Sequence, residues 1–348
     1  MSVRRRSHLL ALAVGALVLL AACQPLGQDG PATSPSPGQS PADGASPGDG
    51  ASPGGSPAAP GAQRLTIATG GTGGVYFPLG GGLAQELSEN IEGVTATAQE
   101  TSASVDNMLL IGQGEADIAF VLGDTAADAV EGRADFEGSP IDACTLGILY
   151  GNYTQVVTTT ETGIETIEDL RGRSLSVGAP GSGTEVIALR VLEAAGIDAD
   201  ADLSNRSQLL IDETVDALRD GTIDAGFWSG GLPTGALVDL PNIKLIPTAE
   251  YTDQLASEYG PFYIEREIPA DTYEGLTEAV PTIAVPNVLV VNNSMSEELQ
   301  RQITEVLFSQ KDDLVQVHPA ASELDAATAG EVGFMDVCPG AQAFYESQ

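Results

Sequence analysis

The stretch "SVGAPGSGTEV" (176–186) has the form of a phosphate-binding loop but lacks the residue that such a loop needs. A strand-like run ends at Val177, a glycine-rich turn follows, and a helical period begins near Thr184. Gly178 and Gly183 have the spacing of the nucleotide-binding pattern G-x-x-x-x-G-K-[ST], yet Thr184 stands where the lysine must be. A glycine-rich turn before a helix still offers free backbone N–H groups and the positive end of the helix dipole. The stretch therefore suits a small anion such as a carboxylate.

The chain contains this arrangement twice. "LTIATGGTGGVYFPLGG" (65–81) repeats the order of strand, glycine-rich loop and helix. Further along each half, Asp117 and Asp224 follow a glycine turn and precede an apolar strand. Such a repeat predicts α/β architecture with two similar lobes whose strand ends face a shared cleft. The strand-like runs 146–160 and 282–291 are interpreted as the crossings between the lobes.

The N-terminus predicts export. Arginines at 4–6 precede an apolar run at 9–20, and "LAAC" then ends at Cys23, a pattern that resembles a bacterial lipobox. We predict a lipoprotein signal peptide over 1–22 and, over 23–62, a lipidated Cys23 followed by a disordered tether rich in Pro, Gly and Ser. An ordinary signal peptide is the alternative. Both interpretations place the protein outside the cytoplasm, and the first anchors it to the membrane by its lipid, at the cell surface or in the periplasm.

Charge and composition exclude several function classes. The formal net charge of −35 repels nucleic acid. His8 and His318 are the two histidines, both far from the glycine-rich loops, and no Cys/His cluster has metal-ligand spacing. We therefore expect no metal, no cofactor and no enzymatic activity. Cys144 and Cys338 remain, and both a disulfide and two buried thiols are compatible with the sequence.

Seven motifs occur in an order that resembles the TAXI family, the solute-binding subunits of tripartite ATP-independent periplasmic (TRAP) transporters. They are "TGGTGGVYFPLGG", "GEADIAFV", "DLRGRSLSVGAPGSGT", "ALRDGTIDAGFW", "IPADTYEG", "VPTIAVPNVLVV" and "HPAA". The resemblance implies a two-lobed type II periplasmic-binding-protein-like fold with a central ligand cleft. It also implies a small carboxylate ligand, with an amino acid such as glutamate as first choice and a dicarboxylate or 2-oxo acid as second. The implied partner is a TRAP membrane permease with fused small and large subunits.

With this fold, we place lobe I at 63–152 plus 284–348 and lobe II at 153–283, with the hinge near 151–153 and 282–286. An importer-binding protein of the ABC type, for a thiamine precursor, nitrate or sulfonate, is the alternative on the same fold. A sensor or adhesin is a further alternative. Neighbouring genes for an ATPase, a fused permease or a histidine kinase distinguish the three.

Candidate ligand-binding residues lie in the glycine-rich loops and at the strand ends. They are Gly71, Thr72, Gly73, Tyr76, Ser102, Ser104, Asp124, Thr125, Asn152, Ser182, Gly183, Thr184 and Trp228. Backbone N–H groups and hydroxyls would bind the carboxylate, Asp124 would pair with a substrate ammonium, and Trp228 would wall the cleft. Other interpretations stay open: helix caps for Ser182 and Asp124, packing aromatics for Tyr76 and Trp228, and a turn for Asn152. The chain also has Leu-Gly just before Asp124, where the family often carries a Gln-Ser-like pair.

Overall fold

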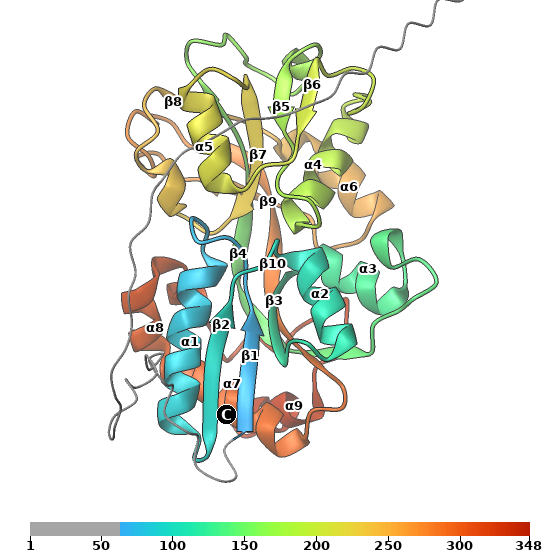
Figure 1. The fold of residues 1–348 in the computed structure, drawn as a ribbon, viewed down its shortest axis with the longest axis vertical. Helices are drawn as coiled ribbons and strands as arrows, with labels where there is room; N and C mark the ends of the chain where they lie inside the picture. The colour runs from blue at the N-terminus through green and yellow to red at the C-terminus, as the bar shows by residue number, and fades with distance from the viewer. Residues whose placement is uncertain (1–62) are drawn as a thin grey trace, which may run out of the picture. The chain divides into compact units, whose positions relative to one another are not determined.

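A computed structural model describes residues 63–348 of the chain (Figure 1). The predicted signal peptide, the lipid on Cys23 and the tether lie outside these residues. None of the helices within 63–348 is both long and apolar enough to cross a membrane.

The described residues form a ten-stranded mixed sheet flanked by helices. The strands are β1 Gln63–Ala68, β2 Val94–Gln99, β3 Ile118–Leu122, β4 Ala143–Thr159, β5 Ser174–Ser176, β6 Asn205–Ser207, β7 Ala225–Gly230, β8 Ile243–Ile246, β9 Ile264–Ile268 and β10 Val280–Asn292. The helices are α1 Tyr76–Asn90, α2 Ser104–Gln113, α3 Gly123–Glu131, α4 Gly183–Ala194, α5 Ile211–Arg219, α6 Thr252–Glu258, α7 Glu297–Ser309, α8 Lys311–Val317 and α9 Pro339–Tyr345. Short 3₁₀ turns are η1 Ala134–Phe136, η2 Glu168–Leu170, η3 Gly235–Leu237, η4 Ala249–Tyr251 and η5 Pro319–Glu323.

The sequence repeat is a structural repeat. In the first half β1 lies between β2 and β3, all parallel, and in the second half β5 lies between β6 and β7, again all parallel. The carboxylate of Asp117 accepts the N–H of Thr66 on β1 at 2.7 Å. The carboxylate of Asp224 accepts the N–H of Ser174 on β5 at 2.8 Å. The two aspartates thus hold equivalent strands in the two halves, which confirms the predicted repeat.

Two long strands join the halves. β4 and β10 are antiparallel neighbours and run down the middle of the sheet (Figure 1). β10 also pairs with β3 of the first half, while β4 also pairs with β7 of the second. Asn152 lies opposite Val285 and Gly151 opposite Pro286, and the register shifts just after Pro286, which has no N–H to donate to the ladder. The predicted crossings are confirmed as parts of these strands, and the exact lobe boundaries stay a prediction.

The hydrophobic core is divided between the two halves of the sheet. One pair of apolar clusters packs around β1 and β3, with Ile67 and Val121 among its fully buried members. The other pair packs around β5 and β7, with Leu175 and Val157 at its centres. This division gives each half of the sheet its own core, as the two-lobed α/β fold requires. Of the two readings of the cysteines, the structure shows the disulfide, which joins Cys144 on β4 to Cys338 at the start of α9.

His318 makes the free energy of unfolding depend on pH, and the direction of the change follows from its pKa shift. Its ring Nδ1 accepts the backbone N–H of Ala320 at 3.1 Å at the start of η5, and the residue is half-buried. Burial lowers the pKa of His318, and the carbonyl of Pro233 opposes this. Because the folded pKa lies below the unfolded value of about 6.5, the unfolded chain takes up the proton first as the pH falls.

We therefore expect the free energy of unfolding to fall as the pH drops from 7.5 through 6.5 toward 5.5. The expected change is less than about 1 kcal/mol, because half of the ring is in contact with water. Urea unfolding of the native protein and of His318→Gln at both pH values measures it. The difference between the two proteins must shrink toward acid pH; a difference independent of pH contradicts the assignment.

Candidate functional site

A pocket with about 540 Å³ of empty space, part of it open to solvent, lies where the strand ends of the two halves meet. The first half contributes the β1–α1 loop, the start of α2 and Leu122 at the end of β3. The second half contributes the β5–α4 loop, the start of α5 and the end of β7. Tyr150 and Asn152 on β4 complete the lining. Such a position is the usual ligand site of open α/β sheets.

Four helices begin at this pocket. Their N-cap residues, Val75 for α1, Ala103 for α2, Ser182 for α4 and Leu210 for α5, all line it. The first N–H groups of a helix have no intrahelical acceptor and carry partial positive charge. The four helix starts therefore give the pocket a positive potential without any basic side chain.

In the β5–α4 loop the backbone of the second half comes close to Ser104 of the first half. Ser182 caps α4 by accepting the N–H of Glu185 at 3.1 Å. The N–H groups of Gly183 and Thr184, the first two of the helix, have no hydrogen-bond partner among the described residues. A Cβ on Gly183 would lie 2.8 Å from the Ser104 Oγ, so only glycine lets the two halves meet here. Ser182 is both the helix cap and a pocket residue.

The two halves also bond to each other beside the pocket. The carbonyl of Gly181 in the β5–α4 loop accepts the N–H of Val105 at 3.1 Å and that of Asp106 at 3.2 Å. These N–H groups belong to the first turn of α2, in the other half. Two N–H groups at the start of α2 are thus satisfied by the opposite half, which ties the two halves together beside the pocket.

Three buried polar atoms that have no hydrogen-bond partner among the described residues belong to pocket residues. They are the Tyr150 hydroxyl, the Asn152 Oδ1 and the Ser229 Oγ, in residues that are 2%, 2% and 6% exposed. A buried polar atom left without a partner costs about 1–3 kcal/mol, so native proteins supply one. Three such atoms around one pocket are available for hydrogen bonds to a bound molecule.

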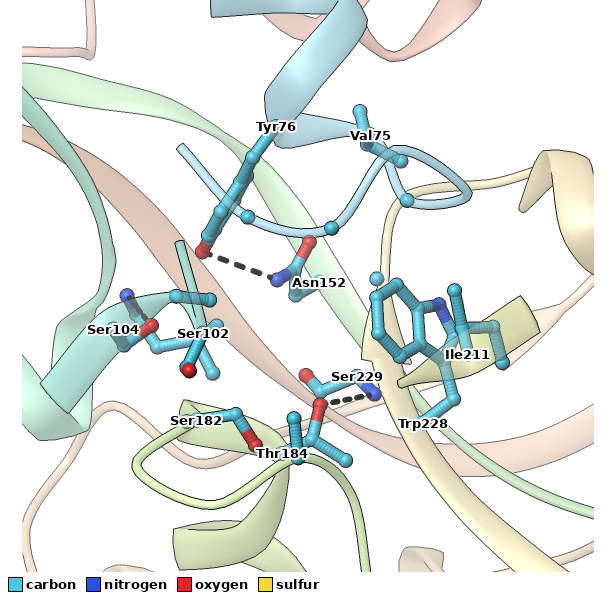
Figure 2. A pocket seen from close by; sticks show the side chains of 18 of the residues that line it. Val75, Tyr76, Ser102, Ser104, Asn152, Ser182, Thr184, Ile211, Trp228 and Ser229 are labelled. Atoms are coloured by element: carbon cyan, nitrogen blue, oxygen red, sulfur yellow. Dashed lines mark hydrogen bonds between the residues drawn. The ribbon is translucent and has the colours of Figure 1, made fainter. Parts of the chain in front are cut away.

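Tyr76 is oriented by its neighbours. Its hydroxyl donates to the Asn287 Oδ1 and accepts from the Asn152 Nδ2 at 3.5 Å (Figure 2). Its ring packs against Phe120, with the centroids 5.4 Å apart. Burial raises the pKa of Tyr76, and burial likewise raises the pKa of Tyr150. Both side chains are therefore neutral hydrogen-bonding groups at physiological pH.

The opposite wall is apolar. Trp228 donates its Nε1–H to the Thr234 Oγ1 at 2.9 Å, away from the ligand space, so it offers the pocket only its ring. Ile211 lies behind the ring, across the pocket from Ser102 and Ser104 (Figure 2). The pocket has a polar side at the starts of α2 and α4 and an apolar side at β7 and α5.

The structure brings most of the predicted site residues together. Those that line the pocket are Gly71, Tyr76, Ser102, Ser104, Asn152, Ser182, Gly183, Thr184 and Trp228. Thr72, Gly73, Asp124 and Thr125 do not line it. Thr72 is exposed and Gly73 packs against the Asp212 carboxylate instead.

The structure places Asp124 outside the pocket lining. Its carboxylate is fully buried, accepts from the Arg190 guanidinium at 3.3 Å and accepts from the Tyr263 hydroxyl at 2.7 Å. It also accepts the N–H of Thr125 at 2.7 Å. Asp124 therefore lies outside the lining with its carboxylate engaged, and its pairing with a substrate ammonium stays a prediction. The N-cap alternative is wrong, because Leu122 is the N-cap of α3.

Sequence reasoning missed Tyr150, Ser229 and the apolar pair Leu210 and Ile211. A signal for Tyr150 existed: it lies two residues before Asn152 on the same strand, and residues i and i+2 share a face. Ser229 follows Trp228 at the end of β7, where polar strand ends were expected. Nothing in the local sequence marks Leu210 and Ile211, which look like an ordinary helix start.

The fold is that of solute-binding proteins. PhnD1 from Prochlorococcus marinus, solved with methylphosphonate, matches with a TM-score of 0.52 and 12% identity over 74% of this chain and 90% of its own. The aliphatic sulphonate binding protein SsuA from Escherichia coli matches with a TM-score of 0.46 and 16% identity over 82% and 83% of the two chains. At such identities the PhnD1 match supports the two-lobed fold alone. A family model covers residues 67–348, most of the chain, and the protein belongs to the NMT1-like family.

Proposed function

We propose that this protein is an extracytoplasmic solute-binding protein that encloses a small anion, such as a carboxylate, between its two lobes. The observation that carries the proposal is the set of unpartnered buried atoms of Tyr150, Asn152 and Ser229 around one pocket. The unbonded N–H groups at the start of α4 support an anion as the guest. The ionisable side chains in the lining are two tyrosines of raised pKa, which suit binding better than proton transfer.

The position of the pocket between the two halves explains how a solute is captured. An anion seated between α2 and α4 contacts both halves, so it stabilises the closed arrangement that the Gly181 carbonyl already favours. β4 and β10 are the only described strands that continue through both halves, and we place the hinge near 151–153 and 282–286 on them. The closed form then docks on a membrane importer.

We infer that the importer is of the ABC type. Membership of the NMT1-like family and the fold shared with a phosphonate-bound protein favour this alternative over a TRAP permease. The ordered motifs of the TAXI family are the observation that supports TRAP as the second candidate. Genes for an ATPase and a separate permease beside this gene support the first, and a gene for a fused permease supports the second. The lipobox at Cys23 supports a lipid anchor for the protein outside the cytoplasm.

Removing the unpartnered hydroxyls tests the binding function. We expect Tyr150→Phe and Ser229→Ala to leave the free protein as stable as before, or about 1 kcal/mol more stable, because each removes a buried group without a partner. Each change should weaken solute binding about tenfold through the lost hydrogen bond. A thermal-shift panel of amino acids, dicarboxylates, 2-oxo acids and alkanesulfonates, with ATP as a control, measures both effects. A solute at a hundred times its dissociation constant adds about 2.7 kcal/mol.

Thr154→Val is the matched control. Its Oγ1 is also buried and unpartnered, yet Thr154 does not line the pocket. This variant should bind as the native protein does. A loss of stability in Tyr150→Phe and Ser229→Ala without a change in solute binding would assign the hydroxyls a structural role. A native protein that responds to no anion in the panel would contradict the proposed function.

A further inference from the structure

The pocket contains no charged side chain. Among the described residues that line it there is no Asp, Glu, Lys, Arg or His. Asp124 is held by Arg190 and Tyr263 outside the lining, and the nearby Glu323 accepts the N–H of Gly151 at 3.1 Å. A ligand charge is therefore met by backbone N–H groups, hydroxyls and helix dipoles alone, which limits the charge that the ligand can carry.

One negative charge fits this arrangement. The starts of α2 and α4 face the same side of the pocket, with the hydroxyls of Ser102, Ser104 and Ser182 beside them (Figure 2). A helix N-terminus carries about half a positive charge. Two first-turn N–H groups of α2, those of Val105 and Asp106, are already bonded to the Gly181 carbonyl, so the start of α4 and the serine hydroxyls remain for one anionic group. A second carboxylate on the ligand would extend to the wall formed by Trp228 and Ile211. The start of α5 lies there, but its first turn carries Asp212 and Glu213, which offset its dipole. Burial of an uncompensated charge is unfavourable, so the pocket selects against dianions.

A ligand ammonium finds no carboxylate. The unpartnered atoms near the centre, the Tyr150 hydroxyl, the Asn152 Oδ1 and the Ser229 Oγ, are all neutral. Both hydroxyls can donate as well as accept. An uncharged oxygen next to the anionic group accepts from both hydroxyls, and a ligand hydroxyl there also donates to the Asn152 Oδ1, which can only accept. An ammonium in the same place stays without a counter-charge. The neutral lining thus favours a keto or hydroxyl oxygen over an amino group.

The chain of the ligand meets an apolar surface. Trp228, Ile211 and Val75 lie across the pocket from Ser102 and Ser104 (Figure 2), and Leu210 also lines the pocket. The only polar group of the Trp228 ring is bonded to Thr234. An aliphatic chain loses its water there without leaving a polar group unpaired. Each buried methylene strengthens binding about fourfold.

We propose, on the basis of the proposed function, that the solute is a monoanionic organic acid with three oxygens at its head and a short uncharged apolar chain. A 2-oxo or 2-hydroxy carboxylate has this chemistry, and so does an alkanesulfonate. This class replaces the expectation of glutamate, because the lining offers no charged side chain to pair with an ammonium or with a second carboxylate. Specificity rests on what the lining lacks as well as on the groups it presents.

Titration calorimetry with matched pairs of compounds tests this class on the purified protein. 4-Methyl-2-oxopentanoate and leucine share a skeleton and differ in the keto and ammonium groups. 2-Oxopentanoate and 2-oxoglutarate share a chain length and differ in the second carboxylate. We expect 4-methyl-2-oxopentanoate to bind at least about tenfold tighter than leucine. We expect 2-oxopentanoate to bind tighter than 2-oxoglutarate by a similar factor. 1-Pentanesulfonate tests whether a sulfonate head serves as well as a 2-oxo carboxylate.

Chain length gives a second measurement. Affinity should rise about fourfold per methylene from pyruvate to 2-oxobutanoate to 2-oxopentanoate, and this slope should flatten in Ile211→Ala. Thr154→Val should keep the native slope. Suppose that leucine, glutamate or 2-oxoglutarate binds more tightly than the keto monoanions and that this binding is lost in Ser229→Ala. That result would overturn the proposed class of solute but leave the solute-binding function standing. Failure of every compound to bind would overturn both.

Discussion

Replacing Arg190 with methionine is expected to lower the free energy of unfolding by about 3–5 kcal/mol. Arg190 on α4 is 8% exposed and binds Asp124 and Asp128 on α3, both of them buried. Its Nη1 also donates to the Tyr263 hydroxyl at 2.7 Å, and its guanidinium lies 4.2 Å from the centre of the Tyr259 ring. Methionine fills much of the volume but leaves the buried Asp124 carboxylate without a counter-charge and Asp128 with Arg133 as its remaining partner.

The loss of unfolding free energy in Arg190→Met should depend on pH. Burial raises the pKa of Asp124, and Arg190 is the main opposing influence. Loss of the guanidinium therefore raises the folded pKa of Asp124 further above its unfolded value. A group of this kind stabilises the fold below its unfolded pKa and loses that contribution as the pH rises through the folded pKa. The stability lost in Arg190→Met must grow from acid toward neutral pH.

Urea unfolding at pH 5 and pH 7.5 measures both effects. Arg301→Met is the matched control, because Arg301 makes its ion pairs with Glu298 and Glu305 on the exposed face of α7. Surface pairs of this kind contribute less than about 1 kcal/mol. A deficit in Arg190→Met no larger than that of Arg301→Met would contradict the assignment of a buried charge network between α3 and α4.

Removing the disulfide is expected to lower the free energy of unfolding by about 2–5 kcal/mol. Cys144 and Cys338 are 194 residues apart, so the bond closes a loop that spans both lobes. A crosslink over such a distance removes much of the conformational freedom of the unfolded chain. It also ties α9 to β4 beneath the first lobe, and both cysteines are buried, so the bond is shielded in the folded state.

Urea unfolding of the Cys144→Ala, Cys338→Ala double variant, with and without reductant, measures the contribution. The native protein should lose stability in reductant to about the level of the variant, and the variant should not respond. Because neither cysteine lines the ligand pocket, solute binding should survive in conditions where the variant is folded. Equal stability of the native protein with and without reductant would contradict a disulfide in solution.

Local signals in the sequence determined the architecture. Glycine-rich turns between strand-like and helical runs predicted the strand–loop–helix units, and the repeat of Asp117 and Asp224 marked equivalent strands in two halves. The cap interpretation of Ser182 is confirmed, and the sequence could offer it because capping depends only on the next three residues. These features are set within a few residues along the chain, which is why a single sequence reveals them.

Tertiary structure alone decided which distant groups meet, and so which solute the pocket suits. Asp124 follows a strand end as a binding residue would, but Arg190, 66 positions away, occupies its carboxylate. Tyr150 and Ser229 became site residues only when the packing of both halves left their hydroxyls without partners. The sequence predicted an anion from its glycine-rich helix starts, whereas the neutral and apolar remainder of the pocket comes from four helix starts and three strands brought together by the fold. Sequence patterns report the local conformation of a segment, and the charge and polarity of a cavity depend on every segment that surrounds it.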